Sequence, residues 1–117
     1  MTLSPRQRYA RDLLELYRRT PDTPPKPRRA DRILAAALYD RRIPLQIVHA
    51  ALLLAAARRA RRPDRATPLA PIATLHYFLP IIDELIAAPP DPGYLAYLRQ
   101  TMATLAPALA DADHQLP

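Results

Sequence analysis

Clustered arginines are the residues of this chain best suited to a chemical task, and that task is the binding of phosphate. Four of them lie within the stretch 58–62, and further pairs lie at 28–29 and 41–42. A guanidinium group is planar and binds phosphate oxygens through paired hydrogen bonds. We therefore predict a site that grips a nucleic-acid backbone without reading its sequence. The predicted site residues are Arg28, Arg29, Arg32, Arg41, Arg42, Arg58, Arg59, Arg61 and Arg62.

The distribution of charge along the chain supports this interpretation. Residues 1–65 carry 16 of the 17 basic groups and 6 acidic groups, which gives a charge of +10. Residues 66–117 carry one basic group, Arg99, and 5 acidic groups, which gives −4. One half of the chain is thus suited to a polyanion and the other is not. The alternative is that the arginines only solvate the surface of an alanine-rich helical protein.

Residue types that support catalysis are scarce. The chain has no cysteine and a single glycine, so it offers neither a thiol nucleophile nor a glycine-rich phosphate loop. The only serine, Ser4, is assigned to a helix cap. The three histidines are far apart in the sequence, and His49 lies on an otherwise apolar helix, where we expect a core histidine or one at a surface edge rather than a ligand. We therefore predict that the protein is not an enzyme, with no catalytic residue, no metal site and no cofactor.

One apolar stretch organises the predicted fold. From Leu45 to Ala57 only Gln46 and His49 are polar. A helix that is apolar on nearly all sides has to be covered by other helices. We predict an all-α fold, a compact bundle of about five helices around a central apolar helix (residues 44–62), with Pro-rich connections. The whole chain is expected to form a single helical domain.

The first segments of the chain predict a helix and a linker. Ser4 and Gln7 fit a capping box, so a helix is expected to begin there and to run to about Arg19. Residues 20–29 contain four prolines and cannot form the interior of a helix. We interpret them as a stiff linker, or as a basic arm in which Lys26 joins the neighbouring arginines.

A second helix is predicted over about residues 30–41, followed by a tight turn into the central helix. Its buried stripe is expected to consist of Ile33, Leu34, Ala37 and Leu38. In an antiparallel hairpin, the start of this helix lies beside the end of the central helix. That arrangement would bring Arg28, Arg29 and Arg32 close to the arginines of 58–62 and create one large basic end.

The spacing of these two helices also invites comparison with a helix-turn-helix unit. In such a unit the second helix reads base edges. Here the positions that would do so are Leu45, Gln46, His49 and Ala50, of which only two are polar. We therefore interpret the central helix as core rather than as a recognition helix.

Prolines are predicted to divide the second half of the chain into separate helices. Residues 71–88 predict a fourth helical region that Pro80 kinks or divides near Leu79. A fifth helix is predicted from about Pro92 into the 110s, and residues 111–117 are expected to form a frayed tail.

Apolar residues of the predicted fifth helix recur at steps of three and four, as in a heptad seam. They include Leu95, Leu98, Met102 and Leu105. Two interpretations stay open: the seam packs on the bundle, or it serves self-association or a protein partner. The predicted partner of the basic half is nucleic acid, DNA in preference to RNA. The alternative function is a protein-interaction adaptor or a helical subunit of a larger assembly.

No stretch of the sequence reaches the ~18 apolar residues that a membrane span requires. The beginning of the chain carries charge throughout its first predicted helix and lacks an apolar signal core. We therefore expect a soluble cytoplasmic protein without a membrane partner.

Two segments in the middle of the chain resemble a known family. They are Ile43-Pro44-Leu45-Gln46-Ile47-Val48, which leads into an alanine-rich helix, and Pro71-Ile72-Ala73-Thr74-Leu75-His76-Tyr77-Phe78. Their order is similar to that in the helical module of DnaD-type replication-initiation proteins and phage replisome organisers, and in small proteins of bacterial mobile elements. The resemblance implies DNA binding during replication initiation, with Tyr77 and Phe78 in the matching segment. From the pattern of the residues alone, we expect Phe78 in the core and Tyr77 near the surface.

Overall fold

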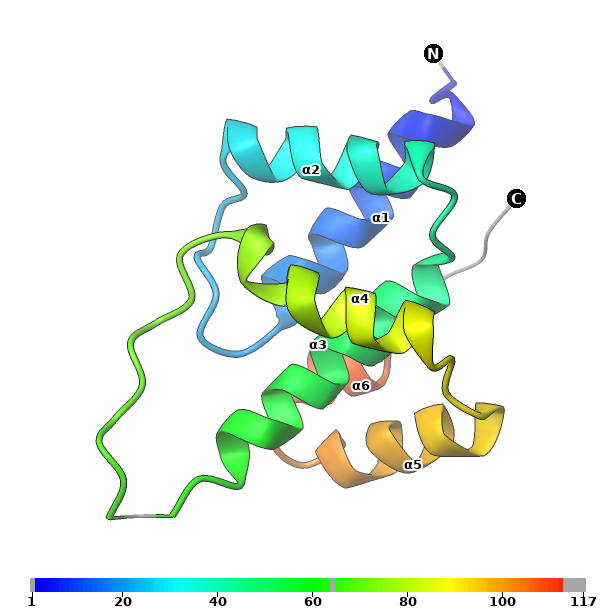
Figure 1. Ribbon diagram of the computed structural model, residues 1–117. Coiled ribbons are helices and arrows are strands. Elements are labelled where there is room, and N and C mark those ends of the chain that lie inside the picture. The colour runs from blue at the N-terminus through cyan, green and yellow to red at the C-terminus, as the bar shows by residue number, and fades with distance from the viewer. Residues whose placement is uncertain (1, 64, 113–117) are drawn as a thin grey trace.

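The structure, a computed structural model, describes residues 2–63 and 65–112. Within these residues every regular element is helical, so the predicted all-α fold is confirmed (Figure 1). The elements in chain order are α1 (Pro5–Arg19), α2 (Arg29–Asp40), α3 (Leu45–Ala60), the 3-10 helix η1 (Leu75–Phe78), α4 (Leu79–Ala87), α5 (Pro92–Met102) and α6 (Pro107–Ala110). Residues 113–117 of the predicted tail lie outside the described residues.

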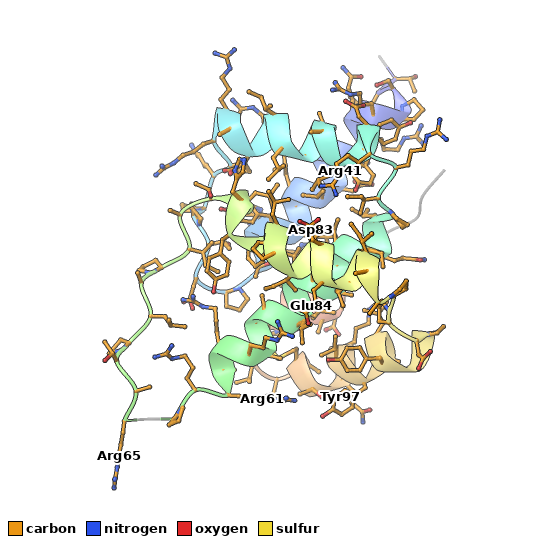
Figure 2. The ribbon with its side chains drawn as sticks, viewed as in Figure 1. Arg41, Arg61, Arg65, Asp83, Glu84 and Tyr97 are labelled. Atoms are coloured by element: carbon orange, nitrogen blue, oxygen red, sulfur yellow. The ribbon has the colours of Figure 1, made fainter. Side chains whose placement is uncertain are left out.

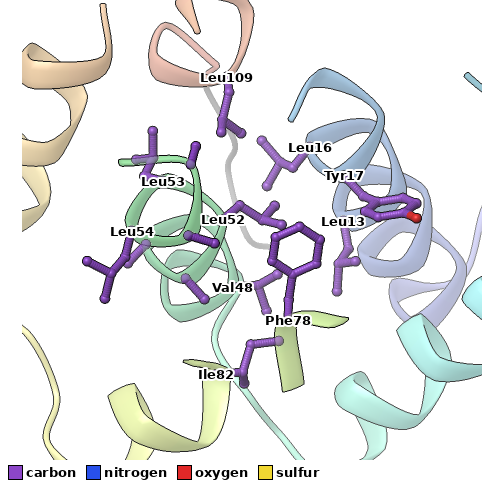
Figure 3. Packing of buried hydrophobic residues seen from close by; sticks show 14 of the residues in the cluster. Leu13, Leu16, Tyr17, Val48, Leu52, Leu53, Leu54, Phe78, Ile82 and Leu109 are labelled. Atoms are coloured by element: carbon purple, nitrogen blue, oxygen red, sulfur yellow. The ribbon is translucent and has the colours of Figure 1, made fainter. Parts of the chain in front are cut away.

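Helix α3 is the centre of the bundle, as its composition predicts. Every residue from Val48 to Ala57 is buried, and Leu45 is buried as well. Helices α1, η1, α4 and α5 all contact it. Figure 3 shows Val48 and Leu52 among side chains that α1, η1, α4 and α6 contribute to the core. Burial of this much apolar surface is the main stabilising term of the fold.

Helix α1 begins at the predicted capping box. The Ser4 hydroxyl accepts a hydrogen bond from the Gln7 backbone N–H (3.1 Å), and the Gln7 side chain accepts one from the Ser4 N–H (2.9 Å). Its buried face carries Tyr9 and Tyr17. The Tyr9 hydroxyl donates to the Ile43 carbonyl (2.8 Å), so α1 also fixes the turn between α2 and α3.

A buried carboxylate sets the position of α2. Asp31 is fully buried, and its two oxygens accept hydrogen bonds from the backbone N–H groups of Arg28 (2.8 Å) and Leu75 (2.9 Å). The first bond closes the first turn of α2, and the second ties that turn to the start of η1. The side of α2 that carries Asp31, Ala35 and Leu38 therefore faces the core.

This register overturns the predicted burial of Ile33. Two residues after Asp31 along a helix of 3.6 residues per turn, Ile33 lies on the opposite side of α2. Its exposed fraction is 60%. The prediction was wrong for Ile33 because Asp31 faces inward. Leu38 is buried and Leu34 and Ala37 are partly buried, as predicted.

The predicted hairpin of α2 and α3 is not formed. Helix α2 packs mainly on α1 and also contacts η1, which lies between the start of α2 and the end of α3 in Figure 1. Because α3 is apolar on all sides, α1, η1 and α4 occupy the positions beside it. The arginines that begin α2 are therefore not gathered with those that end α3.

In the second half of the chain, prolines mark the positions where helices begin. The predicted division near Leu79 is confirmed, since η1 ends and α4 begins there with Pro80 in the first turn. Helix α5 begins at Pro92 but ends at Met102, earlier than predicted, and a turn leads to the short helix α6. Among the described residues, no helix combines the length and the apolar character that crossing a membrane requires.

Replacing Asp31 with Asn is expected to destabilise the fold by about 2 kcal/mol, because the amide offers one acceptor where the carboxylate serves two backbone donors. Asp91→Asn is the matched control, since Asp91 precedes α5 without a side-chain capping bond. Urea unfolding of both variants measures the difference. Equal midpoints for the two variants would contradict the role assigned to Asp31.

Candidate nucleic-acid interface

The predicted phosphate-binding arginines lie at three places in the structure. Arg28, Arg29 and Arg32 lie at the start of α2, and Arg41 and Arg42 form the turn that follows it. The remaining four occupy the last turn of α3 and the residues after it. The three places differ in whether their guanidinium groups form ion pairs or hydrogen bonds with other residues of the protein.

At the end of α3, an ion pair neutralises Arg58. Its two terminal nitrogens donate to the two carboxylate oxygens of Glu84 on α4, at 3.1 and 2.7 Å. These bonds lower the pKa of Glu84, so the pair is fully charged near neutral pH. The pair joins the basic and acidic halves of the chain, and Figure 2 shows Glu84 on the face of α4 above α3.

Arg59 acts as a structural tie. Its side chain is only 12% exposed, and it donates to the Asp22 carboxylate (3.1 and 3.3 Å), to the Tyr77 hydroxyl (3.2 Å) and to the Ala70 carbonyl (3.0 Å). Its guanidinium carbon also lies 5.7 Å from the centre of the Tyr77 ring. Since the Asp22 carbonyl accepts a bond from the Ile72 N–H (2.8 Å), Arg59 holds together two segments that have no regular structure.

The other two arginines of this end differ from each other. Arg62 donates to the Thr67 carbonyl (2.6 Å) within the loop after α3. Arg61 is exposed and forms no side-chain bond with another described residue. Arg65, which was not among the predicted site residues, lies at the tip of the loop in Figure 2.

The turn between α2 and α3 carries two exposed arginines, of which one is paired with a carboxylate. Arg41 donates to Asp83 on α4 at 3.3 Å, so its charge is partly neutralised (Figure 2). Arg42 is exposed and has a φ of 59°, in the left-handed region that non-glycine residues rarely adopt. Its side chain forms no ion pair with another described residue.

The start of α2 carries the largest group of exposed cations that have no ion-pair partner among the described residues. We define the α2 basic cluster as Lys26, Arg28, Arg29 and Arg32, all of which are exposed. None of the four forms an ion pair with a carboxylate in the part of the chain that the structure describes. The acidic residue among them, Asp31, points into the core and leaves four positive charges on the surface.

The histidine of α3 lies in the core, which is one of the two positions expected for it. His49 is fully buried, and its Nε2 lies 2.8 Å from the Leu109 carbonyl. Arg99 lies on the other side of the ring, with a nitrogen 3.4 Å from Nδ1, and it also donates to the Ala112 carbonyl at 3.1 Å. In the described ranges no group of three His, Asp or Glu residues is placed to hold a metal ion.

The seam of α5 lies mostly inside the bundle. Leu98 and Met102 are buried, and Leu95 is partly buried, so these side chains pack on the core. The exposed face of α5 instead carries Tyr94 and Tyr97, whose rings stack with centroids 6.2 Å apart. Leu105 is 62% exposed in the turn beyond the helix. This tyrosine pair was not among the predicted site residues, although its spacing of three residues places both rings on one side of a helix.

Comparison of the chain with family models, with curated proteins and with solved structures found no match. The resemblance to DnaD-type proteins therefore stays a prediction. The positions predicted from the residue pattern for Phe78 and Tyr77 are confirmed, since Phe78 is fully buried and Tyr77 is 43% exposed.

Arg59→Gln is expected to lower the free energy of unfolding by about 1–2 kcal/mol, because the shorter amide cannot reach Asp22, Tyr77 and Ala70 together. Arg61→Gln removes the same charge from an exposed, unbonded side chain and should change stability by less than about 0.5 kcal/mol. Chemical denaturation of the two variants provides the comparison. A loss of stability as large for Arg61→Gln as for Arg59→Gln would show that net charge, and not the tie, is responsible.

Proposed function

We propose that this chain is a non-enzymatic nucleic-acid-binding accessory protein that contacts phosphates through the α2 basic cluster. The observation that carries the proposal is that four exposed cations within seven residues have no acidic partner among the described residues. Side chains with like charge at this spacing repel one another, and a polyanion relieves that repulsion while releasing its own counterions.

Ion pairs formed by arginines elsewhere on the surface support this choice of site. Arg6 binds Asp40, Arg11 binds Asp12, and Arg18 binds Glu15, at 2.6–3.0 Å. These exposed arginines thus have carboxylate partners within the protein, and solvation accounts for them. The α2 basic cluster is different because its own carboxylate, on Asp31, is withdrawn into the core.

The remaining predicted arginines rank below this cluster as phosphate ligands. Arg42 and Arg61 are exposed without an ionic partner and are proposed as supplementary contacts. Arg41 and Arg58 are already paired with acidic side chains of α4, and Arg59 serves the fold. A role in replication initiation or in a mobile element is supported only by the sequence resemblance.

The exposed face of α5 favours a second candidate function, that of a protein-interaction adaptor. Tyr94 and Tyr97 are 39% and 51% exposed, and tyrosine is enriched at the centres of protein interfaces. The only charged side chain within α5, Arg99, is turned inward toward His49. The two functions use different surfaces, so they are separable by experiment.

The proposal predicts how variants of the cluster bind a labelled DNA duplex in fluorescence anisotropy across a salt series. The triple variant Lys26→Gln, Arg28→Gln, Arg32→Gln should bind more weakly, and its log–log salt slope should be shallower by about 2.7, at about 0.9 for each lost phosphate contact. The matched control is Arg11→Gln, Arg18→Gln, Arg19→Gln, which removes the same net charge from positions of α1 that are paired with Asp12 and Glu15. Equal weakening in both triple variants would refute the cluster as the binding site, and no binding by the wild-type protein at low salt would refute the function.

A further inference from the structure

An exposed isoleucine directly follows the cations at the start of α2. Ile33 is 60% exposed, although β-branched apolar side chains are usually buried. Arg29 lies one turn before it on the same side of the helix, and Arg32 lies at its flank. The side chain contributes nothing to the core, because Asp31, Ala35 and Leu38 provide the packed face.

The rest of the outer face of α2 is small and electrically neutral. Ala36 and Ala37 follow Ile33 by one turn and leave room for close approach of another molecule. Asp40, a further turn along, is held by Arg6 through two bonds of 3.0 and 2.9 Å, so its negative charge is compensated. From its start to its end, the outer face thus presents a cation, an apolar side chain, two small residues and a neutralised acid.

The position of α2 in the bundle leaves this face accessible. The helix forms the upper edge of the molecule in Figure 1, and the side of α2 opposite to this face packs on α1 and η1. Its 12 residues span about 18 Å at 1.5 Å per residue. A major groove about 12 Å wide admits a helix of this kind.

We propose that α2 is inserted into the major groove of duplex DNA, an inference that rests on the proposed function and names its substrate class. In this arrangement Arg29 reaches a base edge, where guanine O6 and N7 accept paired bonds, and Ile33 contacts a thymine methyl group. Lys26, Arg28 and Arg32 bind the phosphates at the sides of the groove. The helix that enters DNA is therefore α2 and not the buried helix α3.

Two other anionic partners fit this surface less well. A single nucleic-acid strand is bound by stacking of its bases on exposed aromatic rings, and the aromatic residue of α2, Tyr39, is packed edge-on against Tyr9 at 5.4 Å. An anionic membrane surface requires a continuous apolar stripe, and Ile33 is the only large apolar residue on the outer face of this described helix.

The experiment compares the binding of the wild-type protein to two short duplexes of one sequence, one unmodified and one with glucosylated 5-hydroxymethylcytosine, which fills the major groove. Binding to the glucosylated duplex is expected to be weaker by about tenfold or more, because base-edge contacts are lost while the phosphates are unchanged. Equal affinity for the two duplexes would overturn the insertion of α2 and leave phosphate binding in place. Tighter binding to the matching single strand, or to anionic vesicles, would overturn it in favour of that partner. Absence of binding to every nucleic acid would refute the proposed function as well.

A variant of the isoleucine adds an independent readout. Ile33→Gln should bind the unmodified duplex about threefold to tenfold more weakly, with an unchanged salt slope, because no charge is removed. Ile86→Gln, at an exposed isoleucine of α4, is the matched control and should bind as the wild-type protein does. Wild-type affinity in Ile33→Gln would remove Ile33 from the DNA contact.

Discussion

A helix that is apolar on every side has to be covered on every side, and this constraint on α3 determines where the rest of the chain lies. Helices α1, η1, α4 and α5 all pack on it. The charged residues of α3 itself are consequently confined to its last turn. The same constraint leaves the middle of α3 without a surface for another molecule, since every residue from Val48 to Ala57 is buried.

The burial of one carboxylate, that of Asp31, leaves the surface at the start of α2 positively charged. The carboxylate of Asp31 binds two backbone N–H groups inside the protein, which fixes the register of α2 and ties its first turn to η1. As a consequence, Ile33 faces outward and the neighbouring cations have no acidic partner on this helix. One buried interaction thus connects the stability of the bundle with the surface that we propose for DNA.

The features that depend on local pattern were predictable from the sequence. The capping box at Ser4, the central apolar helix and the division of the fourth helical region at Pro80 all follow from residue type and spacing. Features that depend on tertiary contacts were not. Nothing in the sequence around Arg59 indicates that Asp22 and Ala70 lie beside it, and the inward direction of Asp31 is set by the distant N–H of Leu75. The candidate site was therefore predicted as a set of arginines, and the structure separates the paired ones from the unpaired ones.

The most direct test of the account is an NMR titration of the isotope-labelled protein with a short DNA duplex, following the backbone amide signals. The account predicts that the largest changes fall on residues 26–37, at the α2 basic cluster and the outer face of α2, while the signals of α5 stay in place. Changes confined to Tyr94, Tyr97 and their neighbours, or the absence of any change at low salt, would contradict it.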